Sequence, residues 1–88
     1  MRSEQITRIV IPSSSLGENK TSTISLVRIT LQDGTQYHEV GVLDTRPLDL
    51  RKHKWRVVDS LLTERAGRDL YDATVDAIRA GLPIRVSA

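Results

Sequence analysis

Six consecutive residues, Arg51 to Arg56, carry the densest group of chemically active side chains in the sequence. The segment reads RKHKWR and contains the only tryptophan of the chain. Cations at the start of a helix can hold a phosphate or a nucleic-acid backbone, and an indole ring can stack on a base. The alternative is a solvated helix face whose Lys and Arg stems cover apolar surface. The candidate nucleic-acid or phosphate ligands are Arg51, Lys52, Lys54, Trp55 and Arg56.

Other arrangements that could support catalysis or metal binding are weak. The chain has no cysteine, which excludes disulfides and thiolate metal sites. His38 and His53 lack the spacing of a metal pair, and no nucleophile, phosphate-loop or dinucleotide motif occurs. Asp69, Asp72 and Asp76 fit a solvated helix face. We therefore expect a protein that is not an enzyme and that uses no cofactor and no metal.

Length and composition indicate one small domain covering residues 1–88. Apolar residues make up 39% of the chain, charged residues 27%, and the net charge is +2. This balance is typical of a globular protein and does not by itself imply a nucleic-acid partner. No segment approaches the roughly 20 apolar residues of a membrane span. Together with the absence of cysteine, this favours a soluble protein of the cytoplasm.

The strongest structural signal is a hairpin centred on Asp33-Gly34. Two β-rich runs, TISLVRITLQ and TQYHEVGVL, flank this pair, and the pattern predicts a two-residue type I′ turn. That turn sets Arg28 opposite Glu39, two charges of opposite sign. The face predicted to form the core contains Val27, Ile29, Leu31, His38, Val40 and Val42.

The other face of the same hairpin becomes apolar away from the turn. Ile24, Leu26 and Leu43 lie there and need a cover, which the first strand, a helix or a second subunit could supply. The first strand is predicted at Ile6–Ile11, with Ile9 and Ile11 inward and Pro12 at its end.

Helical spacing begins near Leu48 and is expected to continue to Arg65 or Ala66. Gly67 is predicted as the cap of this helix, and Asp69 as the N-cap of a second helix that ends at Ala80. One long helix kinked at Gly67 is the alternative. Ile84 to Val86 is predicted as a short final strand. A strip of small residues on the second helix would let another element approach closely: Ala73, Ala77 and Ala80.

The predicted fold is therefore α+β, a small and mainly antiparallel sheet in the order β-β-β-α-α-β with the helices packed on one face. The first functional hypothesis is a non-enzymatic interaction module that binds itself as a homodimer or binds another protein. The alternative hypothesis is nucleic-acid binding through the basic helix start at Arg51–Arg56. The predicted protein interface consists of Ile24, Leu26, Leu43, Ala73, Ala77 and Ala80.

Overall fold

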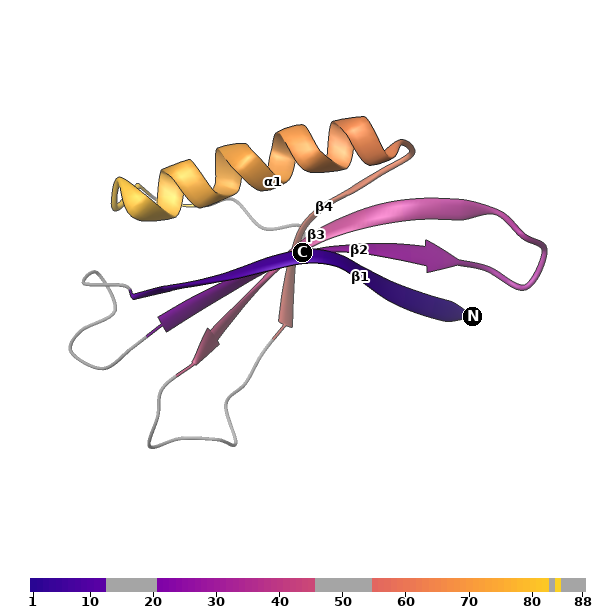
Figure 1. The fold of residues 1–88 in the computed structure, drawn as a ribbon, viewed down its shortest axis with the longest axis horizontal. Coiled ribbons are helices and arrows are strands. Elements are labelled where there is room, and N and C mark those ends of the chain that lie inside the picture. Colours follow the sequence, from indigo (N-terminus) through magenta and orange to yellow (C-terminus); the bar gives the residue numbers. More distant parts are fainter. Residues whose placement is uncertain (13–20, 46–54, 83, 85–88) are drawn as a thin grey trace.

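In the computed structural model, the described residues are 1–12, 21–45, 55–82 and 84, without the side chains of residues 44 and 45. They form a small α+β fold with four strands and one helix. Each strand pairs antiparallel with its neighbour in sequence, so the sheet order is β1-β2-β3-β4 (Figure 1). The elements are β1 (Arg2–Pro12), β2 (Thr21–Thr30), β3 (Gln36–Thr45), β4 (Trp55–Leu61) and α1 (Glu64–Arg79).

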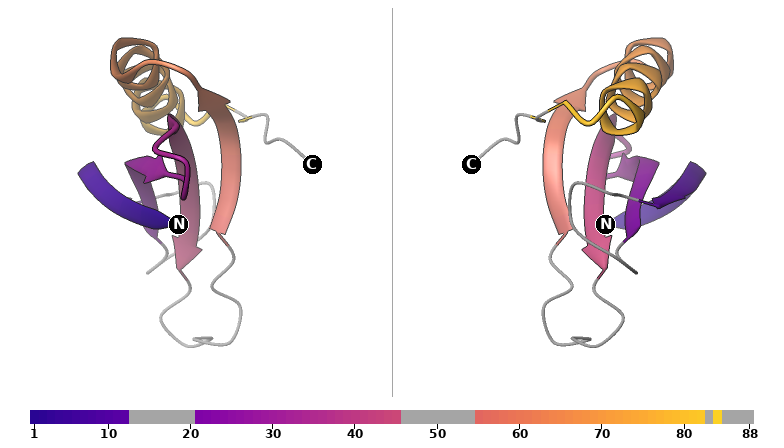
Figure 2. Two further views of the ribbon diagram at one scale, coloured as in Figure 1. Left: turned by 90° about the vertical axis from the view of Figure 1, so that its right-hand side faces the viewer. Right: turned by 90° about the vertical axis from the view of Figure 1, so that its left-hand side faces the viewer.

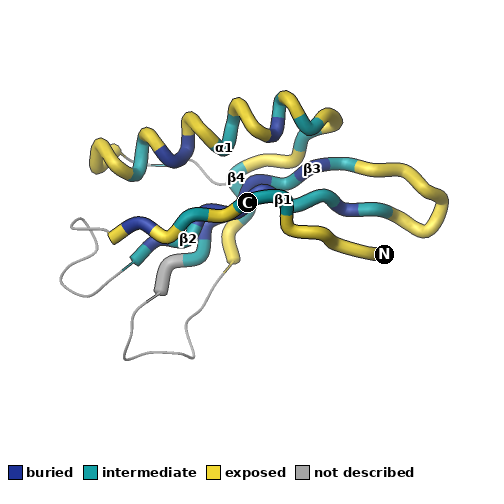
Figure 3. The backbone as a smooth tube through the Cα atoms, in the orientation of Figure 1, coloured by how far each residue is buried: buried dark blue, intermediate teal, exposed yellow. Residues whose placement is uncertain are grey.

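The helix α1 lies over one face of the sheet, and no described helix or strand lies over the other face (Figure 2). We call the face turned away from α1 the outer face. The largest side chains that are fully buried belong to the two central strands. Figure 3 shows buried stretches of the backbone in the sheet beneath α1. Burial of aliphatic groups between a sheet and one helix is what holds so short a chain together. The core cluster is Ile11, Ile24, Leu26, Val40, Val42 and Val75.

The hairpin forms between β2 and β3, but the predicted two-residue turn is wrong. The Leu31 N–H donates to the Thr35 carbonyl at 2.8 Å, and the Gly34 N–H donates to the Leu31 carbonyl at 3.0 Å. Gly34 has φ 87°. This pattern is a three-residue loop, in which a tight turn is followed by a left-handed glycine. The Asp33 carboxylate supports the loop by accepting the Thr35 N–H at 2.9 Å, and this bond lowers the pKa of Asp33.

The extra loop residue shifts the register by one position. Arg28 lies opposite His38 and not opposite Glu39. A shift of one residue moves a whole strand's side chains to the other face. The predicted core face is therefore right for β3 and wrong for β2. His38, Val40 and Val42 are buried, whereas Leu31 is 37% exposed and the β2 positions beneath α1 are Ile24 and Leu26. Ile29 is buried as predicted, but on the outer face.

The predicted order of elements is wrong after β3. Trp55–Leu61 is the edge strand β4, where a helix was expected, and one helix follows it. The pairing of β3 with β4 shifts between Val40 and Gly41, so that Val58 is an extra residue in β4. Because of this β-bulge, apolar and polar residues do not alternate strictly along β4, and two apolar residues are neighbours in the sequence. The result resembles helical spacing over a short window.

The helix α1 begins later than predicted, at a threonine cap. The Ala66 N–H donates to the Thr63 hydroxyl at 3.2 Å, which is the usual chemistry of an N-cap. Gly67 and Asp69 lie inside α1, so their predicted roles as caps are wrong. A Cβ at Gly67 would lie 2.9 Å from Leu26 Cδ1 and 3.3 Å from His38 Cβ. Gly67 therefore allows the helix to lie close against the sheet.

Charged residues fix the first turn of α1 to the sheet. Arg28 of β2 forms an ion pair with Glu64, and it also reaches Glu4 of β1 at 3.4 Å. Arg68 Nε donates to Glu64 at 3.1 Å. The hydrogen bond from Arg68, together with the charges of Arg68 and Arg28, lowers the pKa of Glu64. Glu64 therefore joins helix and sheet as a carboxylate.

The first strand is confirmed and is longer than predicted. Ile11 is buried in β1, and Ile9 packs against the core cluster. Of the predicted final strand, Ile84 packs against the core outside any strand, and the other residues lie outside the described ranges.

Candidate nucleic-acid interface

The outer face of the sheet is built by alternation along the four strands. Side chains next to one another in a strand point to opposite faces, so the residues between the core positions point away from α1. The outer face contains Ser3, Gln5, Arg8, Val10, Thr23, Ser25, Val27, Ile29, Tyr37, Glu39, Gly41, Leu43, Trp55, Val57 and Ser60.

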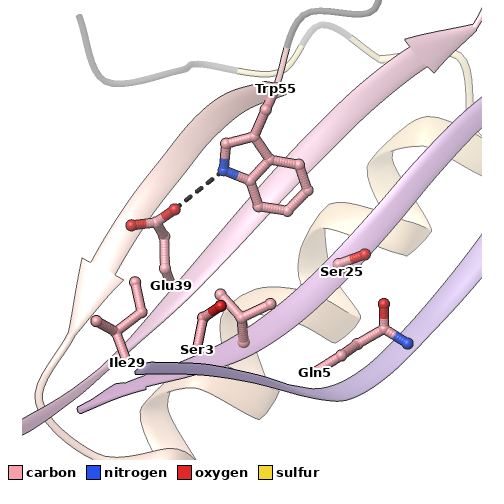
Figure 4. A pocket seen from close by; sticks show the side chains of 7 residues that line it. Ser3, Gln5, Ser25, Ile29, Glu39 and Trp55 are labelled. Carbon is pink, nitrogen blue, oxygen red and sulfur yellow. Dashed lines mark hydrogen bonds between the residues drawn. The ribbon is translucent and has the colours of Figure 1, made fainter. Parts of the chain in front are cut away.

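Trp55 lies flat on this face at the first position of β4. A Cβ at Gly41 would lie 1.9 Å from Trp55 Cζ2, so the indole ring occupies the space that a side chain at residue 41 would need. Trp55 Nε1 donates to Glu39 Oε1 at 3.0 Å (Figure 4). The contact with Gly41 and this hydrogen bond fix the ring in place, while the residue remains 39% exposed. Trp55 is thus an oriented aromatic surface that faces solvent.

An open hollow of about 330 Å³ lies beside the ring. Glu39 and Trp55 stand on one side of it, and β1 and β2 supply small polar and aliphatic groups (Figure 4). Flat heterocycles bind to surfaces that combine an aromatic ring with a few polar groups. The residues lining the hollow are Ser3, Gln5, Ser25, Val27, Ile29, Glu39 and Trp55.

The structure separates the residues that the sequence grouped as a basic site. Trp55 and Arg56 are the first two residues of β4, and the helix start predicted there is wrong. Trp55 pairs with Leu43 on the outer face, whereas Arg56 pairs with Val42, whose side chain is buried beneath α1. Trp55 and Arg56 therefore point to opposite faces of the sheet. The other predicted ligands, Arg51, Lys52 and Lys54, lie outside the described residues.

The residues predicted to form a protein interface are also divided. Ile24 and Leu26 are fully buried in the core, so α1 provides the cover that they need. Leu43 is half-buried on the outer face, opposite Trp55. On α1, Ala73 and Ala80 are exposed and Ala77 is half-buried.

Sequence reasoning missed Glu39 and Gln5 as members of a site. Glu39 was assigned to an ion pair with Arg28, which the observed register removes. The available signal was the polar alternation in β1 and β3, but it identifies a common face only when the register of all four strands is known.

His38, which the sequence places on the core face of the hairpin, takes no part in the outer face. It is buried, and no described residue forms a hydrogen bond with its ring nitrogens. No group of three potential metal ligands occurs among the described residues, and α1 is too short and too polar to cross a membrane. Comparison with family models, curated proteins and solved structures finds no match for this chain.

Proposed function

We propose that the protein binds single-stranded nucleic acid on the outer face of its sheet. One observation carries the proposal: Trp55 lies flat and exposed on that face, directly after the most cationic segment of the chain. Base stacking on an aromatic side chain, next to cations that follow the phosphate backbone, is the general mode of single-strand binding.

The charge distribution supports the same proposal. The residues 46–54, which connect β3 to β4, contain Arg46, Arg51, Lys52 and Lys54 and one acid, Asp49. This segment carries +3, whereas the whole chain carries +2, so the rest of the chain is slightly acidic. Phosphates are therefore attracted to one end of the sheet, the end at which β4 begins with Trp55.

The flat geometry favours an unpaired strand over a duplex. Paired bases are stacked on one another and present only their edges in a groove, where a helix or a narrow ribbon can reach them. A broad sheet with one exposed ring can instead accept a base that has left its stack.

We expect Trp55→Leu to weaken the binding of a labelled 15-nucleotide single strand by about 5- to 100-fold, because one stacked base is lost. Leucine keeps an apolar cover over Gly41 but offers no aromatic face.

Replacing Arg51, Lys52 and Lys54 together by Ala should reduce the slope of log affinity against log salt by about 2. Fluorescence anisotropy at several salt concentrations measures both effects.

A matched control for the charge change is the triple variant with Ala at Arg2, Arg65 and Arg68. These three exposed cations lie on β1 and α1. The control should keep most of the affinity and of the salt slope. The proposal is wrong if the native protein shows no salt-dependent binding, or if the control triple loses as much affinity as the variant.

A second candidate function is self-association, which the partly apolar groove between α1 and β1 favours.

The groove between α1 and β1 is the surface that fits a second copy. Ile9, Tyr71 and Val75 give it apolar walls, and charges of both signs, Asp76 and Arg79, line it as well. In a two-fold dimer the same patch meets itself, so an acid and a base on one rim can pair across the axis. None of the residues of the predicted contact strip lines this groove: Ala73, Ala77 and Ala80.

Sedimentation at micromolar concentration should therefore give twice the monomer mass. Asp76→Arg and Arg79→Asp should each shift the protein toward monomer by placing like charges across the axis, and the double swap should restore the dimer. A monomeric native protein, or a double swap that dissociates further, would rule out this groove as the interface.

A further inference from the structure

Glu39 lies at the centre of the face that we propose for nucleic acid. A negatively charged side chain is unusual there, because it repels the phosphate backbone. Its neighbours across the strands are Val27 and Ser60, which are uncharged. Trp55 donates to Oε1, and no other described residue donates to this carboxylate. Glu39 therefore retains acceptor capacity beside the hollow, where no positive charge of the described residues pairs with it.

Among the described residues that line the hollow, the neighbours of this carboxylate are neutral. Ser3, Gln5 and Ser25 are polar and uncharged, and Val27 and Ile29 are aliphatic. Trp55 and Glu39 lie side by side in Figure 4, joined by their hydrogen bond. A flat ring that enters from solvent would therefore contact Trp55 and the aliphatic residues with its edge toward Glu39. The edge that binds there has to supply donors, because an ionised carboxylate only accepts hydrogen bonds.

We propose that the hollow takes guanine in preference to the other bases. This inference rests on the proposed binding of single-stranded nucleic acid and names the base that the same site selects. Guanine presents two adjacent donors on its Watson–Crick edge, N1–H and the exocyclic amino group, and two oxygens of one carboxylate can accept both. Adenine and cytosine have an acceptor beside their amino group, and thymine and uracil have acceptors on both sides of their single donor.

The test compares a 12-nucleotide strand of alternating thymidine and guanosine with the same strand carrying inosine in place of guanosine. Inosine lacks only the exocyclic amino group. We expect the inosine strand to bind about 10- to 150-fold more weakly, which is the loss of one hydrogen bond to a charged group. In Glu39→Gln the two strands should bind nearly equally, since the amide offers one acceptor and one donor.

Glu4→Gln is the matched control, because it removes a carboxylate from β1 on the helix side of the sheet, where Glu4 faces Arg28. It should keep the preference for guanosine. The ratio of the two affinities is the readout, so a general gain in affinity on removing a negative charge does not affect it. Equal binding of both strands by the native protein, or an unchanged ratio in Glu39→Gln, would overturn the guanine proposal. Absence of binding to either strand would instead overturn the proposed function.

Discussion

Leu26→Ala is expected to lower the free energy of unfolding by about 2–5 kcal/mol, a large part of the stability of so small a domain. Leu26 lies in the central strand β2 and is fully buried, and its Cδ1 would lie within 2.9 Å of a Cβ at Gly67 of α1. Truncation leaves a cavity between sheet and helix that a closely packed glycine cannot fill. Urea denaturation followed by the emission of Trp55 measures the change, with equal m-values in both proteins.

Leu31→Ala is the matched control, since it removes the same atoms from the same strand region. Leu31 is 37% exposed, and we expect its truncation to cost about 0.5 kcal/mol or less. The pair of variants tests the three-residue loop directly, because a two-residue turn at Asp33-Gly34 would exchange the environments of the two leucines. A larger cost for Leu31→Ala than for Leu26→Ala would contradict the observed register.

Gly41→Ala is expected to displace the ring of Trp55, with a stability cost of about 1–3 kcal/mol. The new Cβ would lie 1.9 Å from Cζ2 and within 2.4 Å of two further ring carbons. Displacement breaks the hydrogen bond to Glu39 and removes the oriented stacking surface. The emission spectrum of the single tryptophan should change, and single-strand binding should fall as far as in Trp55→Leu.

A double-mutant cycle separates this clash from other effects of the substitution. In the Trp55→Ala background the ring is absent, so Gly41→Ala should be neutral or stabilising by about 0.5–1 kcal/mol, as expected for a glycine inside a strand. An equal cost in both backgrounds would show that the indole does not lie on Gly41.

The strands of the hairpin could be predicted from the sequence, but the length of its loop could not. The Asp-Gly pair and its β-rich flanks identify two paired strands, and the structure confirms both. The length of the loop was not predictable from them, because Asp-Gly occurs in two-residue turns and in three-residue loops that end in a left-handed glycine. One residue of difference moved Ile24 and Leu26 from a predicted interface to the core.

The error after β3 has a different physical origin. A bulge at Val58 breaks alternation in a strand of only seven residues, and seven residues are too few to separate a strand period from a helix period. Thr63 is a helix-start signal, but the helix predicted from Leu48 runs through this residue, so the sequence does not predict a helix that begins there. Gly67 is predicted as a helix cap because its close packing against Leu26 cannot be seen in the sequence.

The candidate site was predictable only in part. Trp55 and the cations near it are identified by the residue types of one short segment. Their predicted placement on a helix is wrong for Trp55 and Arg56, which lie in β4, and Arg56 points away from Trp55. Glu39 and Gln5 join Trp55 only through the pairing of four strands. A site on the face of a sheet combines residues that lie far apart in sequence, so it depends on every register between them.

The two irregularities in the sheet have a consequence for the protein in concentrated solution. Both occur in the outermost strands, between Gln5 and Thr7 in β1 and beside Val57 in β4, whereas β2 and β3 pair without interruption. An open strand edge offers unsatisfied amides and carbonyls as a template for another chain, and a local kink spoils that template. The sheet is thus regular in the two central strands, which hold the domain together. It is distorted in the two outermost strands, where pairing with another chain would begin.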